Sequence, residues 1–271
     1  MTAPLSSRLF MIPIELPSYL STAYALRFKE VDNQGNFIQR IVQVVRQTWQ
    51  LIHELLNFKP NLLTFRHNAE KLETDFQSLN EKVKDSNKPI CAYFVSSTDH
   101  NGSILGNHLY YYHHYKIRKF ERHYAVVAKV VKTTEEMFQF LHQVKEEYKD
   151  RPIKVVDIVA HGDNKSISIT KETHTGRCYS NVHVQENEFR DCAPDAAIIL
   201  DACSVGQGNK SIAETIAQKN PGKKVFAPGT SLFFSKPIIY EKDRQPSLEH
   251  VVHGFAIVRA YTSRTFRFLT T

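Results

Sequence analysis

VVDIVAHG, residues 155–162, and AIILDACS, residues 197–204, are two similar stretches, each an apolar run that ends in a reactive side chain. Short apolar runs of this kind are typical of strands buried on both faces of a parallel sheet. The first run places His161 at its carboxyl end and the second places Cys203 there. Ligands of open α/β sheets bind beyond the carboxyl ends of the strands. The sequence therefore predicts that an imidazole and a thiol meet at one edge of a sheet.

A thiol and a base at one edge are what nucleophilic thiol catalysis requires. We predict that Cys203 is the nucleophile, reacting as a thiolate, and that His161 is the general acid/base. Each residue alone also has a structural interpretation, because free cysteines often fill cores and strand-end histidines are often only hydrogen-bonded. Their equivalent places on two similar strands favour the catalytic interpretation.

The His-Gly after one apolar strand and the Asp-Ala-Cys-Ser after the next resemble the caspase, legumain and gingipain clan of cysteine peptidases (clan CD). In caspases the histidine lies about 50 residues before the cysteine, close to the interval from His161 to Cys203. Caspases carry Gln-Ala-Cys-Arg/Gln-Gly where this chain has DACSVG (residues 201–206), so a divergent member is expected rather than a caspase proper. The resemblance covers roughly residues 88–240. It implies a caspase-like three-layer α/β sandwich with a mostly parallel central sheet.

The resemblance also implies roles around the two motifs. The backbone amides of Gly162 and Cys203 would form the oxyanion hole. Loops at the same end of the sheet would shape the substrate cleft. From their place after the next predicted strand, Thr230 and Ser231 are candidates for the wall of a specificity pocket. From its position two residues before the cysteine, Asp201 is a candidate to bind a basic substrate side chain. Such a carboxylate would also tend to raise the pKa of the thiol.

No third group that would orient His161 stands out in the sequence. Asp163 follows closely, but aspartate at such a place is more often a turn residue. Asp157 lies four residues before His161 on the same strand face, where a buried carboxylate needs a partner.

The composition fits a conventional globular protein. The chain has 271 residues, of which 42% are hydrophobic and 23% charged, which excludes disordered and fibrous classes. The net charge of +7 is spread along the chain without a long block of like charges. Residues 110–122 mix basic and aromatic side chains, as in surfaces that bind nucleic acid. We expect a solvated face there instead and no nucleic-acid partner, although an acidic protein or an anionic membrane surface would use the same charge.

The cysteines and the N-terminus indicate a reducing setting. Four widely spaced cysteines do not suggest a disulfide scaffold, and neither a signal peptide nor a membrane span is apparent. We expect a cytoplasmic, intracellular protein, acting either in its own cell or as an effector delivered into another. No cofactor or metal is expected. The alternative zinc ligand set, which lacks the paired spacing of zinc knuckles, comprises His174, Cys178, His183 and Cys192.

The chain divides into an N-terminal extension, residues 1–87, and a peptidase domain, residues 88–271. Helical periodicity over 38–58 and 62–83 predicts a hairpin of two helices in the extension, packed on the sheet. In the domain, strands are predicted at 90–96, 124–131, 153–160, 196–201 and 224–227, and helices at 133–149 and 211–219. Period-two alternation at 166–170 and 182–184 predicts a small exposed hairpin between histidine and cysteine. A similar excursion is predicted around Ile238–Tyr240.

These features predict a cysteine peptidase that hydrolyses a peptide or isopeptide bond through a thioester on Cys203. Three alternatives are open. The first is an isopeptidase acting on ubiquitin-like proteins, with residues 38–83 as a recognition surface. The second is an inactive caspase-like adaptor. The third is a zinc-stabilised or basic nucleic-acid-binding module.

Overall fold

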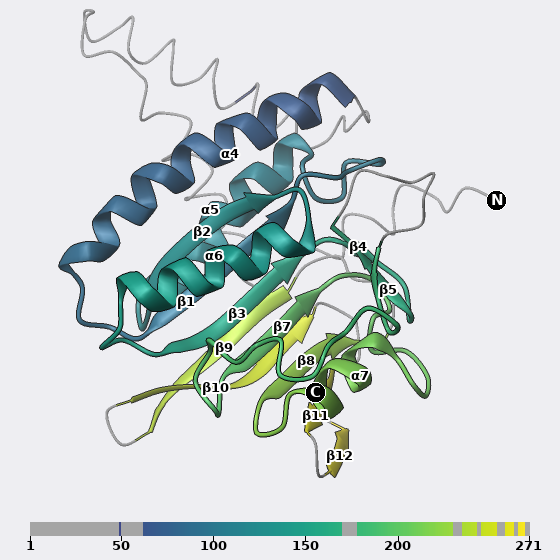
Figure 1. Ribbon diagram of the computed structural model, residues 1–271. Coiled ribbons are helices and arrows are strands. Elements are labelled where there is room, and N and C mark those ends of the chain that lie inside the picture. Colours follow the sequence, from purple (N-terminus) through teal and green to yellow (C-terminus); the bar gives the residue numbers. More distant parts are fainter. Residues whose placement is uncertain are drawn as a thin grey trace, which may run out of the picture.

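A computed structural model describes Trp49, residues 62–169 and 178–229, and four further strands between residues 235 and 268. Its central sheet has seven strands in the order β12-β11-β8-β7-β3-β1-β2, of which β2, β1, β3, β7 and β8 are parallel (Figure 1). The antiparallel β11 and β12 extend the β8 edge. The strands are β1 (Ile90–Ser96), β2 (Ala125–Val131), β3 (Ile153–Val159), β7 (Ala197–Asp201), β8 (Lys224–Pro228), β11 (Val258–Thr262) and β12 (Thr265–Phe268). The predicted α/β class, with a mostly parallel sheet, is confirmed.

Helices cover both faces of this sheet. The helices are α4 (Leu62–Lys82), α5 (Asn107–Glu121), α6 (Thr134–Glu147) and α7 (Ile212–Lys219), with a short 3-10 turn η1 (Val83–Asp85) after α4. Buried residues of α4 and α5 share one core cluster, and those of α6 and α7 share another on the opposite face. Two of these helices begin at side-chain caps, because Thr133 accepts from the backbone N–H of Glu136 and Ser211 from that of Glu214.

The five strands predicted for the central sheet match β1, β2, β3, β7 and β8 closely, and the helices predicted at 62–83, 133–149 and 211–219 match α4, α6 and α7. Helix α4 is part of the sheet's own core: Phe76 of α4 makes an edge-on ring contact with Tyr93 of β1, with centroids 6.3 Å apart. The predicted boundary at residue 87 therefore falls between two elements that pack together. The partner helix predicted at 38–58 lies outside the described residues except for Trp49.

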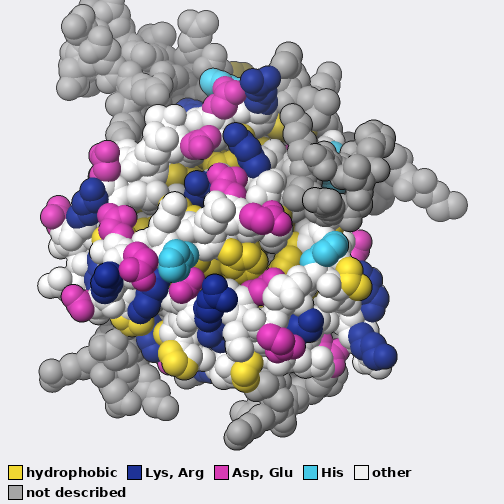
Figure 2. Space-filling view, in the orientation of Figure 1, with side chains coloured by type: hydrophobic (Ala, Val, Ile, Leu, Met, Phe, Trp, Pro, Cys, Tyr) yellow, Lys and Arg dark blue, Asp and Glu magenta, His cyan; other side chains and the backbone are white. Residues whose placement is uncertain are grey.

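The solvated basic face predicted at residues 110–122 is present only in part: Arg118 and Arg122 are exposed, but most of this segment lies in the largely buried helix α5. Four of its tyrosines are only 4–6% exposed, and His113 and Lys116 are 1% and 0% exposed. The strand β9 (Ser235–Lys242) contacts the helix as well. On the face drawn in Figure 2, basic and acidic side chains of the described residues are interspersed. The sequence pattern misled because aromatic rings on several sides of one helix indicate that most of its surface is buried, and because ion pairs with Asp157 and Asp201 allow Lys116 to be buried.

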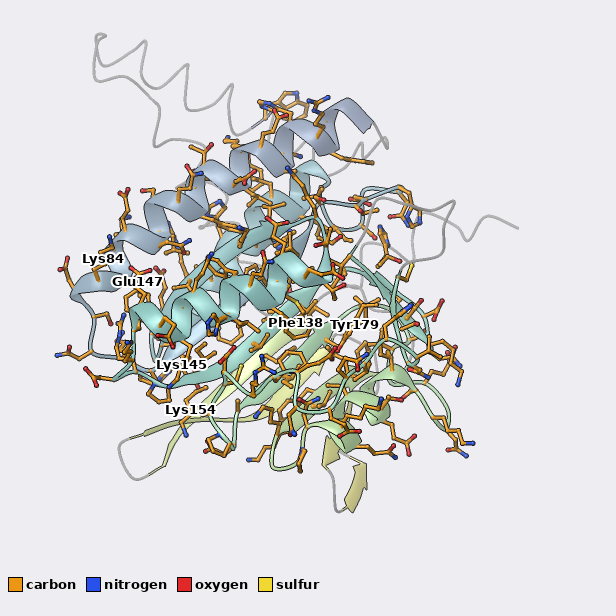
Figure 3. All side chains as sticks on the ribbon, viewed as in Figure 1. Lys84, Phe138, Lys145, Glu147, Lys154 and Tyr179 are labelled. Atoms are coloured by element: carbon orange, nitrogen blue, oxygen red, sulfur yellow. The ribbon has the colours of Figure 1, made fainter. Side chains whose placement is uncertain are left out.

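A small sheet at the carboxyl edge carries the histidine motif. It consists of β4 (His161–Gly162), β5 (Ser166–Ser168) and β6 (Tyr179–Ser180), all antiparallel. The predicted insertion exists, but residues 182–184 form no strand: residues 181–183 are a turn, and the third strand lies just before it. Phe138 of α6 packs edge-on against Tyr179, with ring centroids 6.2 Å apart, and this contact anchors the small sheet (Figure 3). The later excursion is a separate antiparallel pair, β9 and β10 (Gln245–His253).

A buried ion cluster joins α5 to the two central strands. Lys116 of α5 lies 2.6 Å from a carboxylate oxygen of Asp157 on β3 and is also ion-paired with Asp201 on β7. All three side chains are at most 2% exposed. Burial alone would lower the pKa of Lys116, but the two carboxylates outweigh it and raise that pKa above its usual value. Burial raises the pKa of Asp157 to about 7. The lysine thus supplies the partner that the sequence required for Asp157.

Replacing this lysine will destabilise the fold strongly. Lys116→Met leaves two buried carboxylates without their cation, and breaking a buried pair in this way costs about 3–5 kcal/mol. Lys154→Met is the matched control, since Lys154 pairs with Asp195 at 2.6 Å on the surface, with side chains 28% and 67% exposed. Urea unfolding should show a loss below about 1 kcal/mol for the control. Equal losses in the two variants would contradict a structural role for the cluster.

Candidate active site

The candidate site lies where the strand order of the sheet reverses. From β1 the chain first adds β2 on one side and later returns to add β3 on the other. Crevices form at such switch points, outside the carboxyl ends of the strands. The segments that leave the sheet there follow Ser96 of β1 and Val159 of β3, and the segment after Asp201 leaves β7 next to them. Both predicted catalytic residues belong to these segments.

His161 and Cys203 occupy equivalent places on neighbouring strands. The last paired residues of β3 and β7 are Val159 and Asp201, and the backbone N–H of Ala160 still donates to the carbonyl of Asp201 at 3.1 Å. His161 and Cys203 each lie two residues beyond that last pair. Because adjacent strands are about 5 Å apart, the register brings the two backbones close together at this edge.

Gly162 packs directly on the segment that carries the cysteine. A Cβ atom at Gly162 would lie 2.7 Å from Cγ1 of Val205 and 2.9 Å from Cβ of Ala202. These two residues flank Cys203 on either side. The absence of a side chain at position 162 is therefore what allows the histidine and cysteine segments to touch.

Cys203 stands at the start of a strained turn. The next residue, Ser204, has φ +57°, in the left-handed region that non-glycine residues rarely adopt. The turn is closed by a hydrogen bond from Gln207 N–H to the Ser204 carbonyl at 2.8 Å, and Gly206 N–H ties it to the carbonyl of Pro228 at 2.9 Å. Cys203 itself is partly exposed, whereas Cys91 and Cys192 are buried. The turn thus lifts one thiol out of the core.

The structure supplies the orienting group that the sequence did not show. The ring nitrogen Nε2 of His161 lies 2.9 Å from Oδ1 of Asp99, in the segment that follows β1. An ionised carboxylate can only accept, so the proton of the neutral ring belongs on Nε2 and the lone pair on Nδ1. The hydroxyl of Ser103 is 3.4 Å from Nδ1, a long contact. His161 is thereby fixed in the tautomer whose Nδ1 can accept a proton.

Asp99 is buried and saturated with donors. Besides His161, its carboxylate accepts from the backbone N–H groups of Asn101, Gly102, Ile104 and Leu105. Burial alone would raise the pKa of Asp99, but the hydrogen bonds from His161 and from the backbone N–H groups of Leu105 and Ile104 outweigh it and lower that pKa to about 2. Asp99 is therefore ionised at neutral pH, and its hydrogen bonds to the backbone of the following residues hold the loop in shape.

This loop, residues 97–106, is held from behind by both helices of its face. Asn68 of α4 donates to the carbonyl of Leu105 at 2.7 Å, and Nε2 of His113 on α5 is 2.9 Å from the carbonyl of Ile104. The other ring nitrogen of His113 is 2.8 Å from the hydroxyl of Tyr93. Burial lowers the pKa of His113 to about 4, so its ring is neutral and serves as a structural link.

The remaining predicted residues lie in several places. Asp201 is paired with Lys116 inside the core, which leaves its carboxylate 2% exposed, so we do not retain it as a substrate ligand. Thr230 and Ser231 lie outside the described residues, as does His174 of the alternative zinc set. Asp163 accepts from the backbone N–H groups of Lys165 and Ser166, as expected of a turn residue. Within residues 62–169 and 178–229, no group of three or more His, Cys, Asp or Glu side chains is arranged to hold a metal ion.

Comparison with known proteins adds little about chemistry. Residues 126–243 match a family model described as Domain of unknown function (DUF8616), under half of the chain. The match includes His161 and Cys203 and begins after Asp99. No curated protein matches the sequence. Among the described residues, no helix is both long enough and apolar enough to cross a membrane.

The ionised Asp99 will make the fold sensitive to acid. Because its pKa is lowered in the native state, the stabilisation is complete above the ordinary value of 3.8 and is lost as pH falls toward 2. We expect wild type to lose roughly 2 kcal/mol relative to Asp99→Asn over this window. Urea titrations of both proteins at pH 2–5 measure the difference, and a constant difference would contradict the assignment.

A methyl group at position 162 will separate the two motifs. Gly162→Ala forces the new Cβ against Ala202 and Val205, and such overpacking costs about 1–3 kcal/mol. The turn at Cys203 must shift, so the rate at which iodoacetamide alkylates this thiol should change as well. Gly208→Ala is the control, since that glycine has φ +72° but no atom within 4 Å of an added Cβ. It should cost stability through its backbone alone and leave the alkylation rate of Cys203 unchanged.

Proposed function

We propose that this protein is a cysteine peptidase that cleaves an amide bond through a thioester on Cys203, as a divergent member of clan CD with a caspase-like sandwich. The observation that carries the proposal is the arrangement around His161. Its Nε2 is tied to an ionised Asp99, its Nδ1 is left as the basic nitrogen, and its backbone stands in register with Cys203. A nucleophile, a base and a group that orients the base are the three parts of such a catalytic site.

In the proposed reaction, Nδ1 of His161 accepts the thiol proton and the thiolate of Cys203 attacks the substrate carbonyl carbon. The imidazolium that forms is stabilised by the carboxylate of Asp99, which holds its charge at neutral pH. His161 then gives the proton to the leaving amine, and the carbon–nitrogen bond breaks to leave a thioester. A water molecule deprotonated by Nδ1 hydrolyses the thioester and restores the thiol.

The ladder of the small sheet supports the oxyanion role of Gly162. Asp163 N–H donates to the carbonyl of Ser166 at 3.0 Å, so residues 163 and 166 form a hydrogen-bonded pair. Hydrogen-bonded and non-hydrogen-bonded pairs alternate along an antiparallel ladder, so the next pair, Gly162 and Ile167, is not hydrogen-bonded. The N–H of Gly162 therefore faces away from β5. A backbone donor of this kind, beside the cysteine segment, suits the negative oxygen of a tetrahedral intermediate. All four cysteines are free, which suits a thiol nucleophile.

The proposal is tested by covalent labelling with a panel of electrophilic peptide and ubiquitin-like probes, read by intact mass. Cys203→Ala and His161→Ala should each abolish labelling, while Cys178→Ala should label like wild type. Cys178 is the matched control because it is the other partly exposed thiol. The probe that reacts best separates a peptidase from an isopeptidase on ubiquitin-like proteins. Labelling that survives Cys203→Ala, or no labelling by any probe, overturns the proposal and favours an inactive binding module.

A further inference from the structure

The loop at residues 97–106 contacts the ring of His161 on more than its Asp99 edge. The ring of His100 lies against the His161 ring, with centroids 4.0 Å apart and planes inclined by 35°. Ser103, from the same loop, lies at the Nδ1 edge, 3.4 Å from that atom. Three residues of one loop thus contact the imidazole of His161: Asp99 at the Nε2 edge, His100 on one face and Ser103 at the Nδ1 edge.

His100 is exposed, yet the backbone that carries it is firmly held. The carboxylate of Asp99 accepts N–H groups from both sides of the turn, and Oδ1 of Asn101 accepts from Ser103 N–H at 3.0 Å. Gly102 has φ +75°, which lets the chain reverse at this point. Asn68 and His113 fix the far end of the loop. The stacked position of His100 is therefore set by the fold of the loop.

One hydrogen bond cannot fix the plane of an imidazole. The contact between Nε2 and Asp99 holds one atom, and the ring can still pivot about the line of that hydrogen bond. The terminal torsion of a histidine is broad, so the side chain itself supplies little resistance. A second ring packed on the face blocks the pivot. Because Nδ1 lies on the far side of the ring from Nε2, the pivot angle decides where its lone pair points.

We propose that His100 is a positioning residue, which stacks on His161 and holds its ring plane so that Nδ1 stays directed to the thiol of Cys203. This inference rests on the proposed function and adds a residue to it. The long contact with Ser103 is weaker than an ordinary hydrogen bond, so it leaves the lone pair of Nδ1 available to the thiol. What holds the His161 ring in place is the flat ring at position 100, and the ability of that ring to carry a proton plays no part.

Three variants test this idea by steady-state kinetics on the best substrate identified by the probes. His100→Ala removes the ring and should lower kcat about tenfold with KM little changed, because small misplacements of a catalytic group are costly. His100→Phe keeps a flat ring, so its kcat should stay within about twofold of wild type if stacking alone matters. His67→Ala, at an exposed position of α4, is the control and should match wild type. If His100→Phe is as slow as His100→Ala, the stacking role is overturned.

A second measurement needs no turnover. Imidazole ¹⁵N spectra of the full chain labelled at histidine, with His161 assigned by its loss in His161→Gln, report the tautomer of that ring. All three proteins should keep the proton on Nε2, because Asp99 sets the tautomer. The ring signals of His161 should be sharp in wild type and His100→Phe, and broadened by exchange between ring orientations in His100→Ala. An unchanged spectrum in His100→Ala overturns the proposal. If the spectra change as expected but no probe labels Cys203, the proposed function fails, while the role of His100 in holding the His161 ring is still supported.

Discussion

Lys116 brings one positive charge between two carboxylates that stand on neighbouring strands of the central sheet. Asp157 and Asp201 would repel each other and would be costly to bury without it. Their strands are the ones that lead to His161 and Cys203, two to four residues further along the chain. The ion cluster therefore fixes α5 against β3 and β7 directly beneath the candidate site. Because α5 also holds the carbonyl of Ile104 through His113, the same helix positions the loop of Asp99.

Above the ion cluster, the candidate site depends on tight backbone geometry more than on side-chain packing. Ser204 adopts a left-handed conformation directly after the cysteine, and Gly162 leaves no room for a side chain against Ala202 and Val205. Strain of this kind persists only where the surroundings over-determine it. Here the surroundings are the small sheet β4–β6, packed through Tyr179 on Phe138, and the turn tied to the carbonyl of Pro228.

Periodicity was enough to predict the parallel strands and the two motifs at their ends, because buried strands read as unbroken apolar runs. It could not reveal Asp99. That residue follows the strand 90–96 at the same edge as His161, and this position was its one signal, but its role depends on backbone donors that only the folded loop brings together. Helix α5 was missed for a related reason. Its lysines and histidines suggest a surface, and the burial of Lys116 and His113 depends on Asp157, Asp201 and Tyr93, which are distant in sequence.

The two carboxylates near the motifs illustrate how one residue type takes opposite roles. Asp201 lies two residues before the cysteine and looked suited to substrate, yet its side chain points to α5 and neutralises a buried lysine. Asp99 lies far from both motifs in sequence, yet it touches His161, and hydrogen bonds from His161 and from the backbone of Leu105 and Ile104 lower its pKa. Distance along the chain separates these roles poorly, because the pleat sends residues 157 and 201 into the core whereas the loop after β1 returns to the edge. The proposed chemistry at Cys203 thus depends on Asp201, which with Asp157 holds the strands, and on Asp99, which contacts His161.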